Sequence, residues 1–207
     1  AAAACLISPG DKVLNLVSGV FGKWFELFID KFGGETIELA VPYNEAVDPE
    51  DVRRMLKQHP DIKFLSVVHS ETPSATNNPV GEIGPIAKEI GVAWGMDVAI
   101  AGPLKCLGGP PGLSRMSISA DASKAMENHK SPVRGSFLSI LDWKYTWLEK
   151  KVFPYTPSVS DLYALESVLS QVLEEGVEQY AARHEAIAKA CRAGVQGMGL
   201  ELWAARE

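Results

Sequence analysis

The chain has 207 residues, of which 46% are hydrophobic and 22% are charged, the balance of an ordinary soluble globular protein with a sizeable core. Its formal net charge is −6, which argues against a broad polyanion-binding surface because nucleic-acid affinity depends on clustered Lys and Arg. We therefore expect no nucleic-acid partner.

The cysteines and the hydropathy pattern indicate the cellular compartment in which the protein is expected. Cys5, Cys106 and Cys191 are an odd number without metal-site spacing, so we predict neither a disulfide framework nor a metal site. This usage indicates a reduced, cytoplasmic protein. No apolar run approaches the roughly 18 residues that a membrane helix needs, and no targeting segment is visible, so we expect no membrane association.

The predicted elements alternate along the first half of the chain. Ala1–Ile7 reads as the middle of a helix without a cap, so we expect the chain to start inside an element. Strands are expected at Lys12–Val17, Thr36–Val41, Ile62–Val68, Val98–Ala101 and Leu113–Ser119. Helices are expected at Val20–Phe32, from the N-cap Asp48 to about His59, and at Ile83–Ile90. This alternation predicts an α/β fold with a mostly parallel sheet covered on both faces.

The pattern changes from Ser160 onward. A helical stripe runs to Glu175, Gly176 interrupts it, and a second helix covers Val177–Gly194. Gly199–Trp203 is expected to open a strand of a second, smaller domain. We therefore divide the chain into a large domain over residues 1–158 and a C-terminal part over residues 159–207, which holds long helices and the start of the smaller domain.

One stretch breaks the alternation. Val92-Ala93 reads as the first residues of another strand, yet the Val98 strand follows almost directly. A parallel neighbour needs a crossover of about a dozen residues or more. We therefore predict that a segment is missing near Ala93-Trp94.

Three polar or Gly-rich motifs follow predicted strands. They are Ser18–Gly22 after the first strand, His69–Thr76 after the third, and Pro103–Lys105 after the fourth. Ligands of parallel α/β sheets bind at the carboxyl ends of the strands. We expect these motifs to converge on one crevice.

Lys105 is the candidate nucleophile. It lies between an apolar strand and a loop dense in Gly and Pro, where we expect its amine to be desolvated and neutral, as attack on a carbonyl requires. The alternative is an ordinary surface lysine, since most lysines are exposed.

The lysine segment resembles that of a known family. Gly102-Pro103-x-Lys105 followed by Leu107-Gly108-x-Pro110-Pro111-Gly112 resembles the cofactor-lysine segment of the class V aminotransferases of fold type I, which include alanine–glyoxylate and serine–pyruvate enzymes. Cys106-Leu107-Gly108 with Pro110–Leu113 is most similar to the pyridoxamine–pyruvate branch. Cysteine desulfurases usually carry His where Leu104 stands here, which disfavours that branch.

This resemblance implies the fold and the activity of an aminotransferase. The fold would be the large domain of fold type I with the start of a smaller C-terminal domain, in a homodimer or higher homo-oligomer. The cofactor would be pyridoxal 5'-phosphate, or pyridoxal and pyridoxamine would exchange as substrates. An amino group would pass from a small-molecule donor to a small 2-oxo acid, with Lys105 as Schiff-base residue and general acid–base.

The resemblance also implies five further cofactor contacts. Phe21 would place its ring over the pyridine, unless it is a core phenylalanine, and Thr72 would bond the ring oxygen, unless its hydroxyl serves the turn. Cys106 lies in the lysine segment itself. Tyr155 and Thr156 would reach the neighbouring subunit's site, unless they form a capped Pro-rich loop.

Departures from the family pattern keep alternatives open. The aspartate that pairs with the pyridine nitrogen is missing, and we transfer its role neither to Asp97 nor to any other residue. Arg206 is not assigned to the substrate carboxylate, and His69 and Glu71 are not assigned as catalytic bases. Two further hypotheses are a phosphate-dependent alanine–glyoxylate or serine–pyruvate type enzyme and a non-catalytic, degenerate scaffold.

Overall fold

The structure is a computed structural model that describes residues 1–90 and 97–204. The segment predicted to be missing near Ala93-Trp94 lies outside the described residues. Two compact units form: the first holds the described residues of Ala1–Val98 and Ile118–Pro154 with Trp203 and Ala204, and the second holds Ala99–Ser117 and Tyr155–Leu202. Residues 99–117 thus pack with the C-terminal helices, whereas the predicted division counts them with the large domain.

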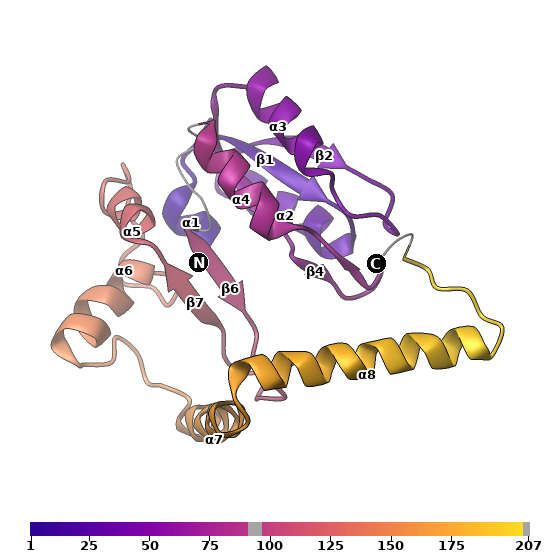
Figure 1. Cartoon of the computed structure of the whole chain (residues 1–207). Coiled ribbons are helices and arrows are strands. Elements are labelled where there is room, and N and C mark those ends of the chain that lie inside the picture. The colour runs from indigo at the N-terminus through magenta and orange to yellow at the C-terminus, as the bar shows by residue number, and fades with distance from the viewer. Residues whose placement is uncertain (91–96, 205–207) are drawn as a thin grey trace. The chain divides into compact units, whose positions relative to one another are not determined.

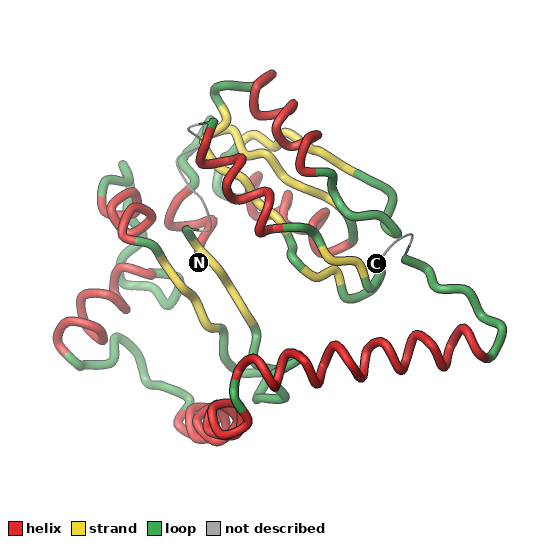
Figure 2. The backbone as a smooth tube through the Cα atoms, in the orientation of Figure 1, coloured by secondary structure: helices red, strands yellow, loops and turns green. Residues whose placement is uncertain are grey.

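Figure 2 shows the succession of helices and strands along the backbone. The strands are β1 (Lys12–Val17), β2 (Glu35–Ala40), β3 (Ile62–Val67), β4 (Ser70–Glu71), β5 (Thr76–Asn77), β6 (Val98–Ala101) and β7 (Arg115–Ile118). The helices are α1 (Ala2–Leu6), α2 (Val20–Lys31), α3 (Pro49–Gln58), α4 (Val80–Glu89), α5 (Ala120–Glu127), α6 (Ile140–Asp142), the π-helical η1 (Trp143–Leu148), α7 (Val159–Glu175) and α8 (Val177–Gly197).

A parallel sheet of three strands, ordered β2-β1-β3, forms the centre of the first unit. The central strand β1 is buried on both faces. Leu14 and Leu16 pack with α3 and α4, which Figure 1 shows together over one face, and Val13 packs on the other face against Ile29 of α2 and Ala3 of α1. A parallel sheet needs apolar cover on both sides, and helices cover both faces of this one. The predicted α/β fold is therefore confirmed.

Local signals fix the start of α3 and the break between α7 and α8. Asp48 accepts a hydrogen bond from the backbone N–H of Glu50 at 2.8 Å, and Pro49 takes the first helical position of α3, as the sequence predicts. In the second unit Gly176 separates α7 from α8 with a φ of +93°, a conformation that favours glycine. Figure 1 shows the two helices running in different directions.

Several predicted boundaries need correction. α4 begins at Val80 rather than Ile83, because Pro79 can precede a helix and Pro85 is accommodated inside it. The prediction of a strand at Gly199–Trp203 is wrong, because these residues form no strand. An extended segment becomes a strand only when its backbone pairs with a neighbouring strand. The β4–β5 hairpin and α5, α6 and η1 have no counterpart in the sequence prediction.

Among the described residues, no helix combines the length and apolarity needed to cross a membrane. Within the same ranges, no group of His, Cys, Asp and Glu is arranged to hold a metal ion.

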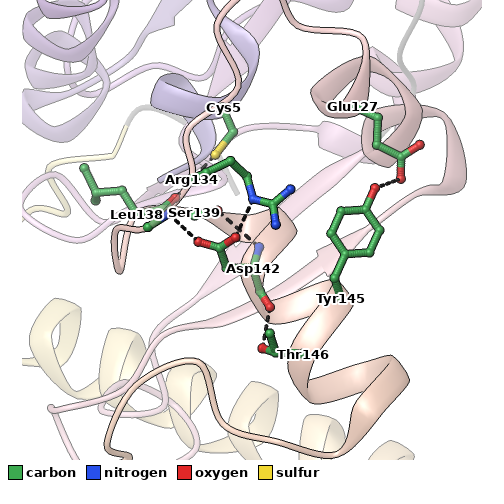
Figure 3. A network of polar contacts seen from close by, with 9 residues as sticks. Cys5, Glu127, Arg134, Leu138, Ser139, Asp142, Tyr145 and Thr146 are labelled. Carbon is green, nitrogen blue, oxygen red and sulfur yellow. Dashed lines mark hydrogen bonds and ion pairs between the residues drawn. The ribbon is translucent and has the colours of Figure 1, made fainter.

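A network of polar contacts in the first unit includes Asp142 (Figure 3), which directly follows Ile140 and Leu141 of a second buried apolar cluster. Its carboxylate accepts hydrogen bonds from Arg134 Nε at 2.5 Å and from the Gly135 N–H at 2.7 Å. Ser139 caps α6 by accepting from the Asp142 N–H at 3.1 Å. Burial by itself would raise the pKa of Asp142, but the hydrogen bonds from Arg134 and Gly135 and the positive charge of Arg134 lower it below its ordinary value of 3.8.

This lowered pKa predicts a pH-dependent contribution to stability. A carboxyl whose pKa is lower in the folded state stabilises the fold above its unfolded pKa and loses that contribution as the pH falls through the folded value. We expect Asp142→Asn to lower the free energy of unfolding by about 1–3 kcal/mol at neutral pH. The difference from the unmutated protein should shrink below pH 3.8, as measured by urea unfolding across pH. A constant difference down to the acid limit would contradict this assignment.

Candidate functional site

The turn between β1 and α2 lies at the carboxyl end of the central strand. α2 starts after Gly19, which has no side chain to cap the helix, and the first turn of α2 contains no acidic residue. The first N–H groups of a helix have no partner within the helix. They need an acceptor from elsewhere in the chain.

Glu71 of β4 provides that acceptor. Its Oε1 accepts from the Gly22 N–H at 2.6 Å, and its Oε2 accepts from the Phe21 N–H at 3.2 Å. The residue is only 1% exposed, and a negative charge is favoured at a helix N-terminus. A carboxylate some 50 positions further along the chain thus caps α2.

Two glycines make room for this carboxylate. A Cβ on Gly19 would lie 2.4 Å from Glu71 Cδ, and a Cβ on Gly22 would lie 3.2 Å from Glu71 Oε1 and 2.9 Å from the Leu16 carbonyl oxygen. Real Cβ atoms essentially never lie closer than 3.0 Å to another heavy atom of this kind. The close approach of Glu71 and of the Leu16 carbonyl to this turn therefore explains why both positions are glycine.

A buried asparagine in β1 fixes the same turn from inside the sheet. Asn15 is 1% exposed. Its Nδ2 donates to the Gly22 carbonyl at 3.0 Å, and its Oδ1 accepts from Ser66 Oγ of β3 at 2.6 Å. One amide thus joins the first turn of α2 to the neighbouring strand.

A second buried asparagine joins the ends of β1 and β3. Asn78 Nδ2 donates to Ser18 Oγ and to the Val68 carbonyl, each at 2.7 Å, and its Oδ1 accepts from the Val47 N–H at 3.0 Å. The predicted convergence of the Ser18–Gly22 and His69–Thr76 motifs is therefore found within the first unit.

Phe21 and Thr72 stand beside this network with accessible side chains. The Phe21 ring is 40% exposed and meets Trp24 edge-on at 5.5 Å, so it is not a core phenylalanine. Thr72 directly follows Glu71 and is exposed. The turn is instead served by Ser74 and Thr76, whose hydroxyls share a hydrogen bond of 2.8 Å. The side chains of both predicted cofactor contacts are therefore accessible to solvent.

The lysine loop, which we define as Gly102–Gly112, belongs to the second unit. The Gly108 N–H donates to the Lys105 carbonyl at 2.9 Å, and the Gly109 N–H donates to the Pro103 carbonyl at 2.8 Å. Lys105 is exposed, so the expectation of a buried amine is wrong for the chain by itself. The neighbouring side chains Leu104 and Cys106 are exposed as well, so they do not bury the amine.

The other predicted contacts of the lysine share its unit. Cys106 and Thr156 are exposed, and Tyr155 is half-buried. Phe21 and Thr72 belong to the first unit. Asp97, to which no cofactor role was transferred, has a structural partner: it accepts a hydrogen bond from Ser119 Oγ.

Three residues that hold this site together, Glu71, Asn15 and Asn78, have no predicted role from the sequence. A signal for Asn15 was present, because a lone amide inside the apolar strand Lys12–Val17 needs a buried partner. No comparable signal marks Glu71 or Asn78, whose partners are distant in sequence.

Known proteins resemble the chain over its full length, although no protein-family model matches it. It is 45% identical to a pyridoxamine–pyruvate transaminase of Mesorhizobium japonicum, an alignment that covers 100% of this chain and 57% of the relative. The crystal structure of pyridoxamine–pyruvate aminotransferase from Mesorhizobium loti superposes with a TM-score of 0.94 at 44% identity, over 100% of this chain and 57% of that one. The chain belongs to the class V aminotransferase family.

A more distant structure agrees with this membership. The alanine–glyoxylate aminotransferase from Nostoc sp. matches with a TM-score of 0.89 at 26% identity, over 97% of this chain and 58% of that one. This member of the class V aminotransferases spans a little over half the length of the curated relatives it matches.

The alignment with the Mesorhizobium japonicum relative bears on the predicted missing segment. It runs over 225 positions, 18 more than the 207 residues of this chain. The relative therefore carries residues that this chain lacks. The missing segment near Ala93-Trp94 stays a prediction.

The close approach of Gly19 to Glu71 predicts coupling between the two positions. Glu71→Ala should lower the free energy of unfolding by about 1–3 kcal/mol, because a buried backbone donor loses its acceptor. Gly19→Ala should also destabilise, but less in the Glu71→Ala background, where the carboxylate it would meet is gone. A double-mutant cycle by chemical unfolding measures this coupling.

Glu45→Ala is the matched control for that cycle, because Glu45 is an exposed glutamate of the same unit. We expect its effect to stay within about 0.5 kcal/mol. Strict additivity of Gly19→Ala and Glu71→Ala would show that the carboxylate does not occupy the space beside Gly19.

Proposed function

We propose that this protein is a pyridoxal-dependent aminotransferase of the pyridoxamine–pyruvate type, with Lys105 as the residue that binds the carbonyl group covalently. The observation that carries the proposal is the 45% identity to the Mesorhizobium japonicum pyridoxamine–pyruvate transaminase along the whole chain. The amino donor would be pyridoxamine and the acceptor pyruvate, giving pyridoxal and L-alanine.

The residues present fit a flat aromatic aldehyde. Among the described residues, none forms a hydrogen bond or ion pair with the exposed Lys105 amine, so the nitrogen lone pair is available after deprotonation. Phe21 offers an exposed ring face for stacking, and the Thr72 hydroxyl has no partner within the described ranges. Cys106, Tyr155 and Thr156 would supply the remaining contacts.

Each of these residues has a distinct task in the proposed reaction. When bound, the pyridoxal ring accommodates the negative charge that remains after the substrate carbon loses its proton. Lys105 Nζ would first act as nucleophile toward the carbonyl carbon, and after displacement by the substrate amine it would carry the proton between the two carbons. Phe21 would hold the ring plane, and Thr72 would donate its hydroxyl hydrogen to the ring oxygen.

The second candidate is a phosphate-dependent aminotransferase of the alanine–glyoxylate or serine–pyruvate type. The similarity to the Nostoc sp. alanine–glyoxylate enzyme supports it. The first candidate is preferred because the identity falls from 44% to 26% between the two solved structures. The two differ in whether pyridoxal itself or its phosphate is bound.

We also propose a homodimer in the cytoplasm. Tyr155 and Thr156 lie in a segment similar to the one that reaches the neighbouring subunit in this family, which supports the dimer. The three cysteines are free, which is compatible with a reducing compartment.

An absorbance titration of the full-length purified protein tests the proposed function. Pyridoxal and pyridoxal 5'-phosphate are added separately, and we expect a band at about 420 nm from condensation of the aldehyde with a lysine amine. Lys105→Ala should abolish the band, and Lys150→Ala, which removes another exposed lysine, should leave it unchanged. The aldehyde that gives the band at lower concentration decides between the two enzyme types.

The same titration can reject the proposal. No band with either aldehyde, in protein of intact mass, would exclude the aminotransferase and favour the non-catalytic scaffold. A band that persists in Lys105→Ala would place the covalent site at another lysine.

A further inference from the structure

A side chain of the long helix α8 is hydrogen-bonded to the lysine loop of the second unit. Tyr180 of α8 donates its hydroxyl hydrogen to the Cys106 carbonyl oxygen at 2.5 Å. Leu104, Lys105 and Cys106 are all exposed, so apolar burial does not hold this part of the loop. The hydroxyl of Tyr180 therefore restrains the peptide unit between Cys106 and Leu107, one residue beyond Lys105.

The orientation of the Tyr180 ring is itself fixed by neighbours along α8. The Arg183 guanidinium lies 4.8 Å from the ring centroid, and the His184 ring lies at 4.4 Å. Glu175 holds the guanidinium with two hydrogen bonds, of 2.6 Å from Nε and 2.8 Å from the terminal nitrogen. A cation over a tyrosine face is favourable, so the hydroxyl is presented to the loop in one direction.

The end of the lysine loop meets α7. A Cβ on Gly112 would lie 2.2 Å from Asp161 Oδ2, so the loop backbone runs directly against that carboxylate. Ser158 Oγ donates to the same oxygen at 2.7 Å. The loop is thus bounded by α7 at Gly112 and by α8 at Cys106.

We propose that Tyr180 is a positioning residue for Lys105. The peptide bond between Cys106 and Leu107 is planar, so a fixed Cys106 carbonyl restricts the backbone from which the lysine side chain extends. The inner turn, closed by Gly108 and Gly109, then transmits this restriction to the Lys105 carbonyl. The role assigned to Lys105 rests on the proposed function, whereas the attachment of the loop to α8 does not.

Tyr180→Phe in the full-length protein tests the inference, because it removes one hydroxyl and keeps the ring beside Arg183. Tyr163→Phe is the matched control, since Tyr163 is an exposed tyrosine of α7 in the same unit. Two quantities are measured for each protein: amide hydrogen exchange of the peptide covering Pro103–Gly112, and the rate at which pyridoxal becomes attached to Lys105.

Attachment is followed by quenching with borohydride and locating the modified lysine by mass spectrometry. The Lys105 amine adds to the aldehyde carbon, the carbonyl oxygen leaves as water, and hydride from borohydride reduces the resulting C=N bond to a stable amine. For Tyr180→Phe we expect loop exchange to be faster and attachment slower, each by about three- to tenfold, the range that loss of one hydrogen bond allows. Tyr163→Phe should match the unmutated protein.

The outcomes separate the inference from the proposed function. Attachment at the unmutated rate in Tyr180→Phe would overturn the positioning role, while attachment to Lys105 in the unmutated protein would still support the aminotransferase. Unchanged loop exchange in Tyr180→Phe would overturn the restraint itself. No attachment to Lys105 in the unmutated protein would overturn both the proposed function and the positioning role, even if loop exchange had become faster. Circular dichroism checks the fold, and Tyr180→Trp provides a second variant that lacks the hydroxyl if Phe is not tolerated.

Discussion

The candidate site depends on one buried carboxylate. Glu71 caps the N-terminus of α2 through the N–H groups of Phe21 and Gly22. A buried charge is costly unless it is hydrogen-bonded, and here two backbone donors and the positive end of the helix offset that cost. Because Glu71 lies in the β4–β5 hairpin and Phe21 in α2, this interaction fixes the two loops of the first unit relative to each other.

Two amides extend the same constraint into the sheet. Asn15 and Asn78 each satisfy both a donor and an acceptor with groups from separate segments. The Val47 N–H and the Val68 carbonyl, which Asn78 pairs, lie outside helices and strands and have no ladder partners. These hydrogen bonds therefore fix the backbone at the carboxyl end of the sheet. The exposed side chains of Phe21 and Thr72 extend from that fixed backbone.

The lysine loop is held by contacts of a different kind. Lys105 is exposed, and its backbone is held by the turn bonds at Gly108 and Gly109 together with the hydroxyl of Tyr180. Under the proposed function, an exposed lysine suits such a loop, since an amine that reacts with an aldehyde must be reachable. The local contacts hold the backbone around Lys105, and they leave its amine unpaired within the described residues.

The sequence by itself determined the features that depend on local chemistry. Strand β1, the capped start of α3 at Asp48 and the break at Gly176 followed from periodicity, capping and glycine conformation. The lysine motif indicated the family. The exposure of Lys105, the failure of Gly199–Trp203 to form a strand and the partners of Glu71 and Asn78 were decided only by the tertiary structure. Each of these depends on segments far apart along the chain, whose approach no local pattern encodes.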